Sequence, residues 1–436
     1  MSFESLGLAP ALLRAVSEQG YTTPTTIQSE AIPQALAGHD LLAGAQTGTG
    51  KTAAFVLPLL QRLFVNKPVT GSRKPRALIL APTRELAVQV HDSLRAYAKH
   101  LRVNSTAIYG GNAMRPQFDA LRRGVDVLVA TPGRLIDHMD RRTADLSGIE
   151  MLVLDEADRM LDMGFMPAIK RILQEVPNQR QTLLFSATFD APIKQLAQQF
   201  MRNPVEIQVA ARNSVAETVT HRVHPVDGAR KRDLLLHLLG EDSRRQTLVF
   251  SRTKHGADRL CEQIEAAGIK AVAIHGNKTQ GARTRALRDF KTGRATVMVA
   301  TDVAARGLDI DNLPVVINYD LPMVAEDYIH RIGRTGRAGA EGLALSLVSS
   351  AEANLLRSIQ RLLKTDLALV DVPGFAPNRP LRLDGSGGAP GSARPGARPG
   401  GHAHPRRPHG QAPRRAHAGA GAKPYAGRSN PRTGTR

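Results

Sequence analysis

The chain has 436 residues, which is too long for one ordinary hydrophobic core and predicts two or three domains. Its net charge of +20 indicates a polyanionic partner. The only cysteine, Cys261, excludes an intramolecular disulfide framework and a cysteine-based zinc site, and we expect it to be an inert apolar side chain. Because the opening MSFESLGL has no features of a signal peptide and no apolar stretch is long enough to span a bilayer, we expect a soluble cytoplasmic protein.

A glycine-rich turn follows the first short apolar run, Leu41 to Ala43, and leads into helix-forming sequence. The turn reads AQTGTGKT over residues 45–52 and departs from G-x-x-x-x-G-K-[ST] only at Ala45. Backbone N–H groups of such a turn surround a phosphate, while Lys51 adds a positive charge and the Thr52 hydroxyl can bind Mg²⁺. The alternative is a plain surface turn. The residues expected to bind nucleotide are Ala45, Gln46, Thr47, Gly48, Thr49, Gly50, Lys51 and Thr52.

Short apolar runs that stop at polar residues recur along the rest of the chain, with helical patterns such as 84–98 and 256–267 between them. Buried strands alternating with helices predict an α/β fold with parallel sheets covered on both faces. Ligands of such sheets bind outside the carboxyl ends of the strands. The predicted strands are 77–81, 125–130, 151–154 and 182–185 in the first half, and 247–250, 271–274, 296–300 and 315–317 in the second.

Two sheets are implied, in domains over 1–207 and 221–371, with a linker over 208–220. Beyond Val372 the composition changes to glycine, proline, alanine and arginine. Residues 372–436 contain twelve lysines and arginines and a single acidic residue, Asp384. Such a segment cannot bury a core, so we expect a disordered basic tail.

An acidic group, Asp155-Glu156-Ala157-Asp158, directly follows the predicted strand 151–154. A carboxylate at a strand end beside bound phosphates suits a hydrated Mg²⁺, and Asp155 fits that role. Glu156 is then placed to orient the attacking water or to accept its proton. The alternative is a solvated acidic turn.

The chain resembles the DEAD-box RNA helicases of superfamily 2, because residues 155–158 spell their signature and further motifs follow in the family's order over residues 1–370. Its opening and layout are most similar to the bacterial RhlE-type subgroup. The resemblance implies two RecA-like domains in tandem. It also implies RNA-stimulated ATP hydrolysis coupled to local, non-processive opening of RNA duplexes and remodelling of RNA–protein complexes. The further motifs are GYTTPTTIQ (20–28), PTRELA (82–87), GG (110–111), TPGR (131–134), SAT (186–188), LVFSRT (248–253), HGNKTQGAR (275–283), ATDVAARGLDI (300–310) and HRIGRTGR (330–337).

The resemblance also assigns residues around ATP. An amide such as that of Gln28 can pair with N6 and N7 of adenine, although a surface glutamine is the alternative. Arg334 and Arg337 would act as arginine fingers on the γ-phosphate, unless they belong to a solvated basic face. Further assignments are Phe3, stacked on the base or else a core residue; Tyr21 and Gly307, near the nucleotide; Asp309, on the ribose or else in a structural turn; and Asp158, Ser186, Thr188 and His330, which would couple hydrolysis to strand separation.

RNA contacts are expected at strand ends that offer hydroxyl, guanidinium and backbone N–H donors to phosphate. Such contacts give sequence-independent binding, and aromatic residues are too scarce, at 4 %, for base-by-base recognition. Gly111 and Gly276 in this set have a turn as their alternative role. The set is Pro82, Thr83, Arg84, Gly111, Thr131, Gly133 and Arg134 in the first domain, and Arg252, Gly276, Arg283 and Thr301 in the second.

ATP, Mg²⁺ and RNA are therefore the expected cofactors and partner, with ribosomal precursors or an RNA-decay complex as family-level targets. The basic tail would tether RNA, or else serve solubility or a protein partner. Two other functions remain open at this point. One is a DNA translocase of the same superfamily, and the other is an RNA-annealing protein that uses ATP only as a clamp.

Overall fold

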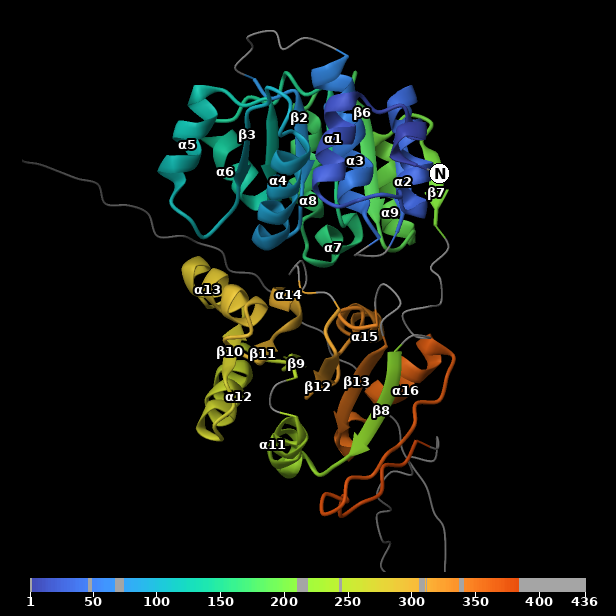
Figure 1. Cartoon of the computed structure of the whole chain (residues 1–436), viewed down its shortest axis with the longest axis vertical. Coiled ribbons are helices and arrows are strands. Elements are labelled where there is room, and N and C mark those ends of the chain that lie inside the picture. Colours follow the sequence, from blue (N-terminus) through green and yellow to red (C-terminus); the bar gives the residue numbers. More distant parts are fainter. Residues whose placement is uncertain are drawn as a thin grey trace, which may run out of the picture. The chain divides into compact units, whose positions relative to one another are not determined.

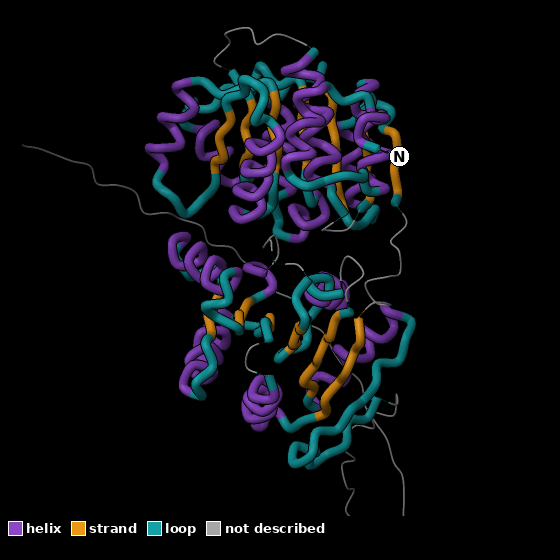
Figure 2. Tube along the Cα trace, in the orientation of Figure 1, coloured by secondary structure: helices purple, strands orange, loops and turns teal. Residues whose placement is uncertain are grey.

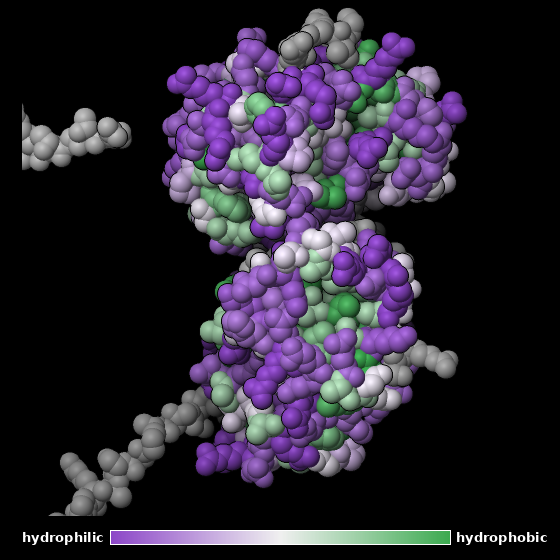
Figure 3. All heavy atoms as spheres, turned by 90° about the vertical axis from the view of Figure 1, so that its left-hand side faces the viewer, coloured by the Kyte–Doolittle hydropathy of each residue, from purple (hydrophilic) through white to green (hydrophobic). Residues whose placement is uncertain are grey.

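The computed structural model describes residues 2–45, 49–66, 74–209, 219–242, 245–305, 310, 312–336 and 341–383. Within this part of the chain, no helix has the length and apolar character needed to cross a membrane. Most of the face seen in Figure 3 is hydrophilic, with apolar patches between. The large hydrophobic side chains that are exposed among the described residues are Tyr21, Val65, Met323, Val324, Leu362 and Leu369.

The first half of the chain forms a seven-stranded parallel sheet in the order β3-β4-β2-β5-β6-β1-β7 (Figure 1). Most of its strands are short runs buried along their whole length, as continuous apolar strands in a sheet covered on both faces should be. The strands are β1 Leu41–Gly44, β2 Ala77–Leu80, β3 Ser105–Ile108, β4 Val127–Ala130, β5 Met151–Leu154, β6 Gln181–Ser186 and β7 Val205–Gln208.

Alternate residues of these strands enter two separate cores. Ala77 and Ile79 of β2 pack in one hydrophobic cluster, and Leu78 and Leu80 pack in the other. Helices therefore cover both faces of the sheet (Figure 2). The helical elements are η1 Phe3–Leu6, α1 Pro10–Glu18, α2 Thr26–Ala37, α3 Lys51–Leu60 with the π-helical turn η2 Gln61–Val65, α4 Arg84–Tyr97, α5 Met114–Arg123, α6 Pro132–Asp140, α7 Ala157–Asp162, α8 Met166–Glu175 and α9 Ala191–Phe200.

The second half forms a six-stranded parallel sheet in the order β10-β11-β9-β12-β13-β8. Leu248 and Phe250 of β9 face one hydrophobic cluster, while Val249 faces another. The prediction of two parallel α/β sheets is therefore confirmed. The elements are β8 Val219–Pro225, η3 Gly228–Arg230, α11 Lys231–Glu241, β9 Thr247–Phe250, α12 Lys254–Ala266, β10 Ala271–Ile274, α13 Gln280–Lys291, β11 Val297–Ala300, α14 Asp302–Ala305, β12 Val315–Asn318, α15 Ala325–Ile332, β13 Gly342–Val348, η4 Ser350–Glu352 and α16 Ala353–Leu363.

Both ends of the expected linker 208–220 belong to strands. Gln208 is the last residue of β7 and pairs with Gly44, and β8 begins at Val219. These two strands lie at sheet edges and carry exposed polar side chains, so their sequences lack the continuous apolar run that marks a buried strand. Residues 210–218 lie outside the described part of the chain.

The boundary expected at Val372 is wrong, because residues 372–383 pack on the second domain. Phe375 lies against the cluster that contains Val249, and the Arg230 guanidinium sits 4.8 Å from the centre of its ring. The backbone N–H and side-chain amide of Asn378 both donate to Asp227. The boundary was set too early because it rested on the average composition of the whole tail, in which a few apolar and aromatic residues that pack on the domain carry little weight. Residues 384–436 lie outside the described part.

Cys261 is buried on α12, and burial raises the pKa of its thiol to about 12. A thiol with so high a pKa is unreactive at neutral pH, as the sequence predicted.

Candidate functional site

The polar residues at the strand ends of the first sheet fall into two groups, set by strand order. The residues expected to bind ATP or to couple its hydrolysis follow β1, β5 and β6, which are adjacent strands. The residues expected to contact RNA follow β2, β3 and β4, which are also adjacent strands. Because all these strands are parallel, both groups lie along the same carboxyl edge of the sheet.

Lys51 begins α3 directly after Gly50, and its side chain is buried. Its Nζ atom has no hydrogen-bond partner among the described residues. Thr52 follows on the same first turn and is half-buried. A buried ammonium without a partner is costly, so this geometry favours an anion that arrives from outside the chain.

Gln28 is buried, and its amide holds the end of the glycine-rich turn. Nε2 donates to the Gly50 carbonyl oxygen at 3.1 Å, and Oε1 accepts the Thr25 N–H at 2.9 Å. The Thr25 hydroxyl donates to the Thr49 carbonyl oxygen at 2.8 Å. Gly50 has φ +89°, and a Cβ there would lie 2.4 Å from the Gln28 Nε2. In this structure Gln28 therefore positions the phosphate turn, and its pairing with adenine stays a prediction.

Asp155 and Glu156 are both buried at the end of β5, yet their carboxyl groups are held differently. Burial raises the pKa of Asp155 to about 7, although Lys51 opposes the shift, and its Oδ1 has no partner among the described residues. Burial acts in the same direction on Glu156. There the Arg159 guanidinium, 2.9 Å from Oε2, and the Lys51 ammonium outweigh burial and hold the pKa below its usual value. Glu156 also has φ 51°, a strained conformation for a non-glycine residue.

Asp158 joins the ends of β5 and β6. Its Oδ2 accepts the Ala187 N–H at 2.9 Å, and its Oδ1 accepts the Arg159 N–H at 2.9 Å. The Ser186 hydroxyl oxygen accepts the Thr188 N–H at 3.4 Å. Three of the residues expected to couple hydrolysis to strand separation are thus brought together around Ala187.

A pocket joins these residues to the second domain. It is lined by Lys51, Glu156, Asp158, Arg159, Asp162, Ala187, His330 and Arg334. Arg334 lies close enough to Glu156 for its charge to lower the pKa of that carboxyl. Sequence reasoning missed Arg159, which lies in the first turn of α7 and turns back to the Glu156 carboxylate before that helix.

On the nucleic-acid side of the first domain, Gly111 makes room for Arg84. Gly111 has φ +83°, and a Cβ there would lie 2.0 Å from the Arg84 Nη1. Thr83 caps α4 by accepting the Leu86 N–H at 3.3 Å, and Thr131 occupies the N-cap of α6. The Arg134 guanidinium donates to the Asn112 carbonyl oxygen at 3.1 Å. Pro82 is buried and Gly133 is exposed beside them.

In the second domain the expected RNA contacts Arg252, Gly276 and Thr301 follow β9, β10 and β11, which are adjacent strands. Arg283 is held by another part of the chain. Its guanidinium is buried and forms an ion pair with Glu85 at 2.9 Å, and its contact with RNA stays a prediction. The segment that carries Arg283 shows no local sign of this carboxylate, since Glu85 lies far away in the sequence.

Two aromatic residues expected near the nucleotide do not line the pocket that contains Lys51. Phe3 is 6 % exposed and belongs to the hydrophobic core, so its stacking on a base stays a prediction. Tyr21 is 52 % exposed and lines a different cavity from Lys51. The remaining nucleotide-site candidates, Gln46, Thr47, Gly48, Gly307, Asp309 and Arg337, lie outside the described residues.

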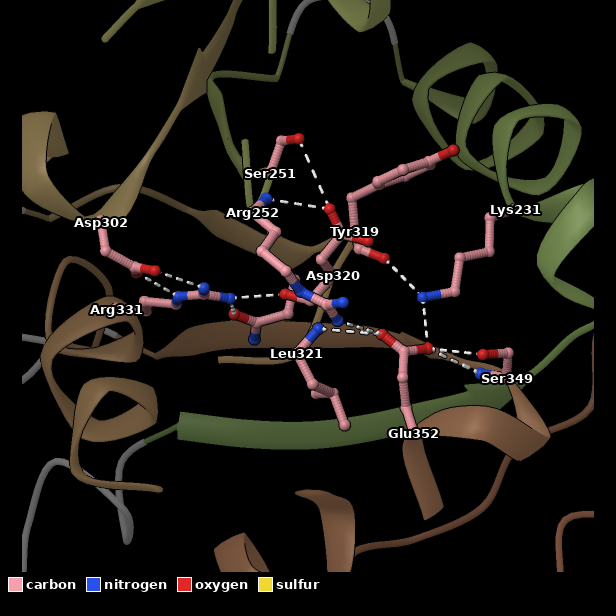
Figure 4. A network of polar contacts seen from close by, with 11 residues as sticks. Lys231, Ser251, Arg252, Asp302, Tyr319, Asp320, Leu321, Arg331, Ser349 and Glu352 are labelled. Atoms are coloured by element: carbon pink, nitrogen blue, oxygen red, sulfur yellow. Dashed lines mark hydrogen bonds and ion pairs between the residues drawn. The ribbon is translucent and has the colours of Figure 1, made fainter. Parts of the chain in front are cut away.

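A buried polar network in the second domain was not predicted (Figure 4). The Arg331 guanidinium forms a double ion pair with Asp302, at 2.6 and 2.8 Å, and donates to the Asp320 carbonyl oxygen at 2.6 Å. Arg331 is therefore a structural arginine within HRIGRTGR, unlike Arg334, which lines the pocket with Lys51. On the other side of Asp320 lie Arg252 and Glu352.

Comparison with known proteins agrees with this geometry. A family model described as DEAD/DEAH box helicase matches residues 25–196, and one described as Helicase conserved C-terminal domain matches residues 230–339. The chain is 45 % identical to the DEAD-box ATP-dependent RNA helicase CshA of Bacillus cereus over 372 residues, covering 85 % of this chain and 70 % of that protein. It is 40 % identical to the DEAD-box ATP-dependent RNA helicase RhpA of Helicobacter pylori over 381 residues, covering 87 % and 76 %.

Among solved structures, that of Saccharomyces cerevisiae Dbp5 bound to RNA and ADP BeF3 is similar, with a TM-score of 0.74 and 33 % identity. The similarity covers 85 % of this chain and 95 % of that one. Similarity to the RhlE-type subgroup in particular stays a prediction.

Proposed function

The chain belongs to the DEAD-box ATP-dependent RNA helicases, and from that premise we propose how its residues divide ATP hydrolysis and RNA binding. The observation that carries the proposal is a pair of buried polar atoms, one on an ammonium and one on a carboxyl group. Lys51 Nζ and Asp155 Oδ1 have no partner among the described residues. The ammonium suits the β- and γ-phosphates of ATP, and the carboxylate suits a divalent cation bound to them.

The residues present fit Mg²⁺ held mainly by phosphate and water. Among the described residues, no group of three histidine, cysteine or acidic side chains could hold a metal ion by itself. Asp155 and the Thr52 hydroxyl are the protein groups that would hold it. Bound there, Mg²⁺ would neutralise charge on the phosphate oxygens.

Glu156 is the group that would receive a proton from the attacking water. Arg159 keeps it ionised despite its burial, and an ionised carboxylate is the form that acts as a base. Arg334 would stabilise charge on the γ-phosphate, and Arg337 shares that role by resemblance. Because Lys51 and Arg334 belong to different domains, both domains are needed for a complete site, and hydrolysis should depend on RNA that engages both.

The strand-end residues of both domains would contact the sugar-phosphate backbone, which would give binding without sequence preference. Gly111, Gly133 and Gly276 are exposed and offer backbone N–H groups, and Arg252 offers a guanidinium. When the two domains close on one RNA strand, they would separate a short duplex locally. The Asp158 carboxylate, which joins the ends of β5 and β6, would relay the state of the nucleotide.

The basic segment 384–436 would tether RNA electrostatically. A cytoplasmic location, and RNA targets such as ribosomal precursors or decay substrates, rest on the family resemblance alone.

The test is ATP hydrolysis by the full chain with RNA, with DNA of the same sequence, and without nucleic acid. Lys51→Met removes the ammonium but keeps an apolar stem, and we expect it to lose nucleotide binding and RNA-stimulated hydrolysis. Lys194→Met, at an exposed position of α9 in the same domain, is the matched control. Hydrolysis at the control rate by Lys51→Met would refute the site, and equal stimulation by DNA would refute RNA selectivity.

A further inference from the structure

Glu352 is a buried acid in the second domain, beyond residue 339, where the match to the family model ends. It is the last residue of η4, directly before α16. A carboxylate this deeply buried is uncommon unless partners compensate for its lost hydration.

The Glu352 carboxylate has partners from four different segments (Figure 4). Oε2 lies 2.5 Å from the Lys231 ammonium and accepts the Ser349 N–H and hydroxyl at 3.0 and 2.8 Å. Oε1 accepts the Leu321 N–H at 3.3 Å and lies 3.4 Å from the Arg252 Nη2. These contacts fix both oxygens of the carboxylate, and one of the two is directed at Arg252.

Of the three charged side chains Lys231, Glu352 and Arg252, only that of Arg252 is exposed to solvent. The side chains of Lys231 and Glu352 are 6 % and 8 % exposed, whereas that of Arg252 is 43 % exposed. The buried Lys231 ammonium offsets the charge of the Glu352 carboxylate, and the Arg252 guanidinium is the more exposed of the two cationic groups. Lys231 is held in turn by the Tyr319 carbonyl oxygen at 2.8 Å.

The backbone of Arg252 is fixed as well. Its N–H donates to the Asp320 Oδ2 at 2.9 Å, and the neighbouring Ser251 hydroxyl donates to the same oxygen at 3.4 Å. The segment after β9 is thus held at the main chain by Asp320 and at the end of the side chain by Glu352.

We propose that Glu352, neutralised by Lys231, is a positioning residue that orients the Arg252 guanidinium toward an RNA phosphate. This inference rests on the proposed function, in which Arg252 binds RNA. A long arginine side chain loses rotamer freedom when it binds, so holding it beforehand strengthens binding. Because Lys231 offsets the charge of Glu352, the carboxylate can orient the guanidinium without adding a net negative charge that would repel the phosphate.

The experiment uses the full chain and removes both buried charges together. The double variant Lys231→Met with Glu352→Gln leaves neither buried charge without its partner, a change that folded proteins usually tolerate. Glu352→Gln alone would leave the Lys231 ammonium buried without a counter-charge. Glu241→Gln, an exposed acid on α11 in the same domain, is the charge-matched control for Glu352→Gln. Each protein is also made with Arg252→Ala. Affinity for a labelled single-stranded RNA is measured by anisotropy at several salt concentrations, together with the kcat and KM for RNA in the ATPase reaction.

We expect the double variant to bind RNA about three- to fivefold more weakly, with kcat unchanged, and to add nothing in the Arg252→Ala background. Its salt slope should match the parent, since Arg252 still meets the phosphate, whereas Arg252→Ala should reduce the slope by about one. Tighter binding by the double variant, or the same weakening with and without Arg252, would overturn the inference. If Arg252→Ala leaves RNA affinity and slope unchanged, the proposed RNA contact itself is wrong, and the role of Glu352 fails with it.

Discussion

Substitution of Gly111 by alanine tests whether this glycine serves only the backbone turn or also RNA binding by Arg84. Gly111 has φ +83°, and a Cβ would lie 2.0 Å from the Arg84 Nη1 and 2.4 Å from its Cζ. The left-handed conformation costs an L-residue about 1–2 kcal/mol. The guanidinium is the far end of a flexible side chain, so it would move aside and leave its place at the end of β2. If it donates to an RNA phosphate there, the loss of about 1.5–3 kcal/mol weakens RNA binding roughly tenfold to a hundredfold.

The neighbouring glycine provides the control. A Cβ on Gly110 would meet nothing within 4 Å, and its φ lies outside the left-handed range. Gly110→Ala should therefore change neither stability nor RNA affinity. Anisotropy with a labelled RNA, combined with chemical unfolding, measures both quantities for the two variants and for Arg84→Ala.

The result that would refute the reasoning is specific. If Gly111→Ala loses the expected stability but binds RNA as well as Gly110→Ala does, Gly111 serves only the turn. If it weakens RNA binding as strongly without Arg84 as with it, the effect does not pass through the guanidinium.

Four further predictions concern the site, the tail and the polar network. Glu156→Gln should bind ATP and RNA but lower steady-state hydrolysis by about 10²–10⁴, and near-normal turnover would remove it from the role of base. Asp158→Asn loses a charge-assisted bond to the Ala187 N–H, so we expect about 1.5–3 kcal/mol lower stability and less strand separation per ATP consumed; an unchanged ratio of unwinding to hydrolysis would contradict the coupling role. Truncation after Leu383 should keep thermal stability and ATPase but weaken RNA binding at low salt, whereas truncation after Asp371 also removes Phe375 and should lower Tm; equal Tm values would contradict the packing of that segment. Burial raises the pKa of Glu352, but Lys231 and the hydrogen bonds from Ser349 together outweigh it and hold the pKa below its usual 4.5. The unfolded chain therefore takes up a proton there first, and stability should fall as pH drops below about 5. Chemical unfolding at pH 6 and at pH 4 should show a smaller loss of stability for Lys231→Met with Glu352→Gln than for the parent.

The sequence alone determined which residues gather at the carboxyl edges of the sheets. Strands such as β5 and β9 are short apolar runs that end at polar residues, so local pattern identifies both the strand and the residues at its end. In a parallel sheet those ends meet at one edge by geometry, without any knowledge of strand order. The position of Lys51 at a helix start and that of Glu156 after β5 followed from this argument.

Only the tertiary structure decided strand order and the choice of partners. The order β3-β4-β2-β5-β6-β1-β7 separates the strand ends expected to contact RNA from those expected to bind ATP or to couple its hydrolysis, and no local pattern encodes it. The pairs Arg283 with Glu85, Gln28 with Gly50, and Glu352 with Arg252 join segments whose local sequences give no sign of one another. Periodicity reports which face of an element is buried, whereas a contact between distant segments depends on how the crossover helices bring their strands together.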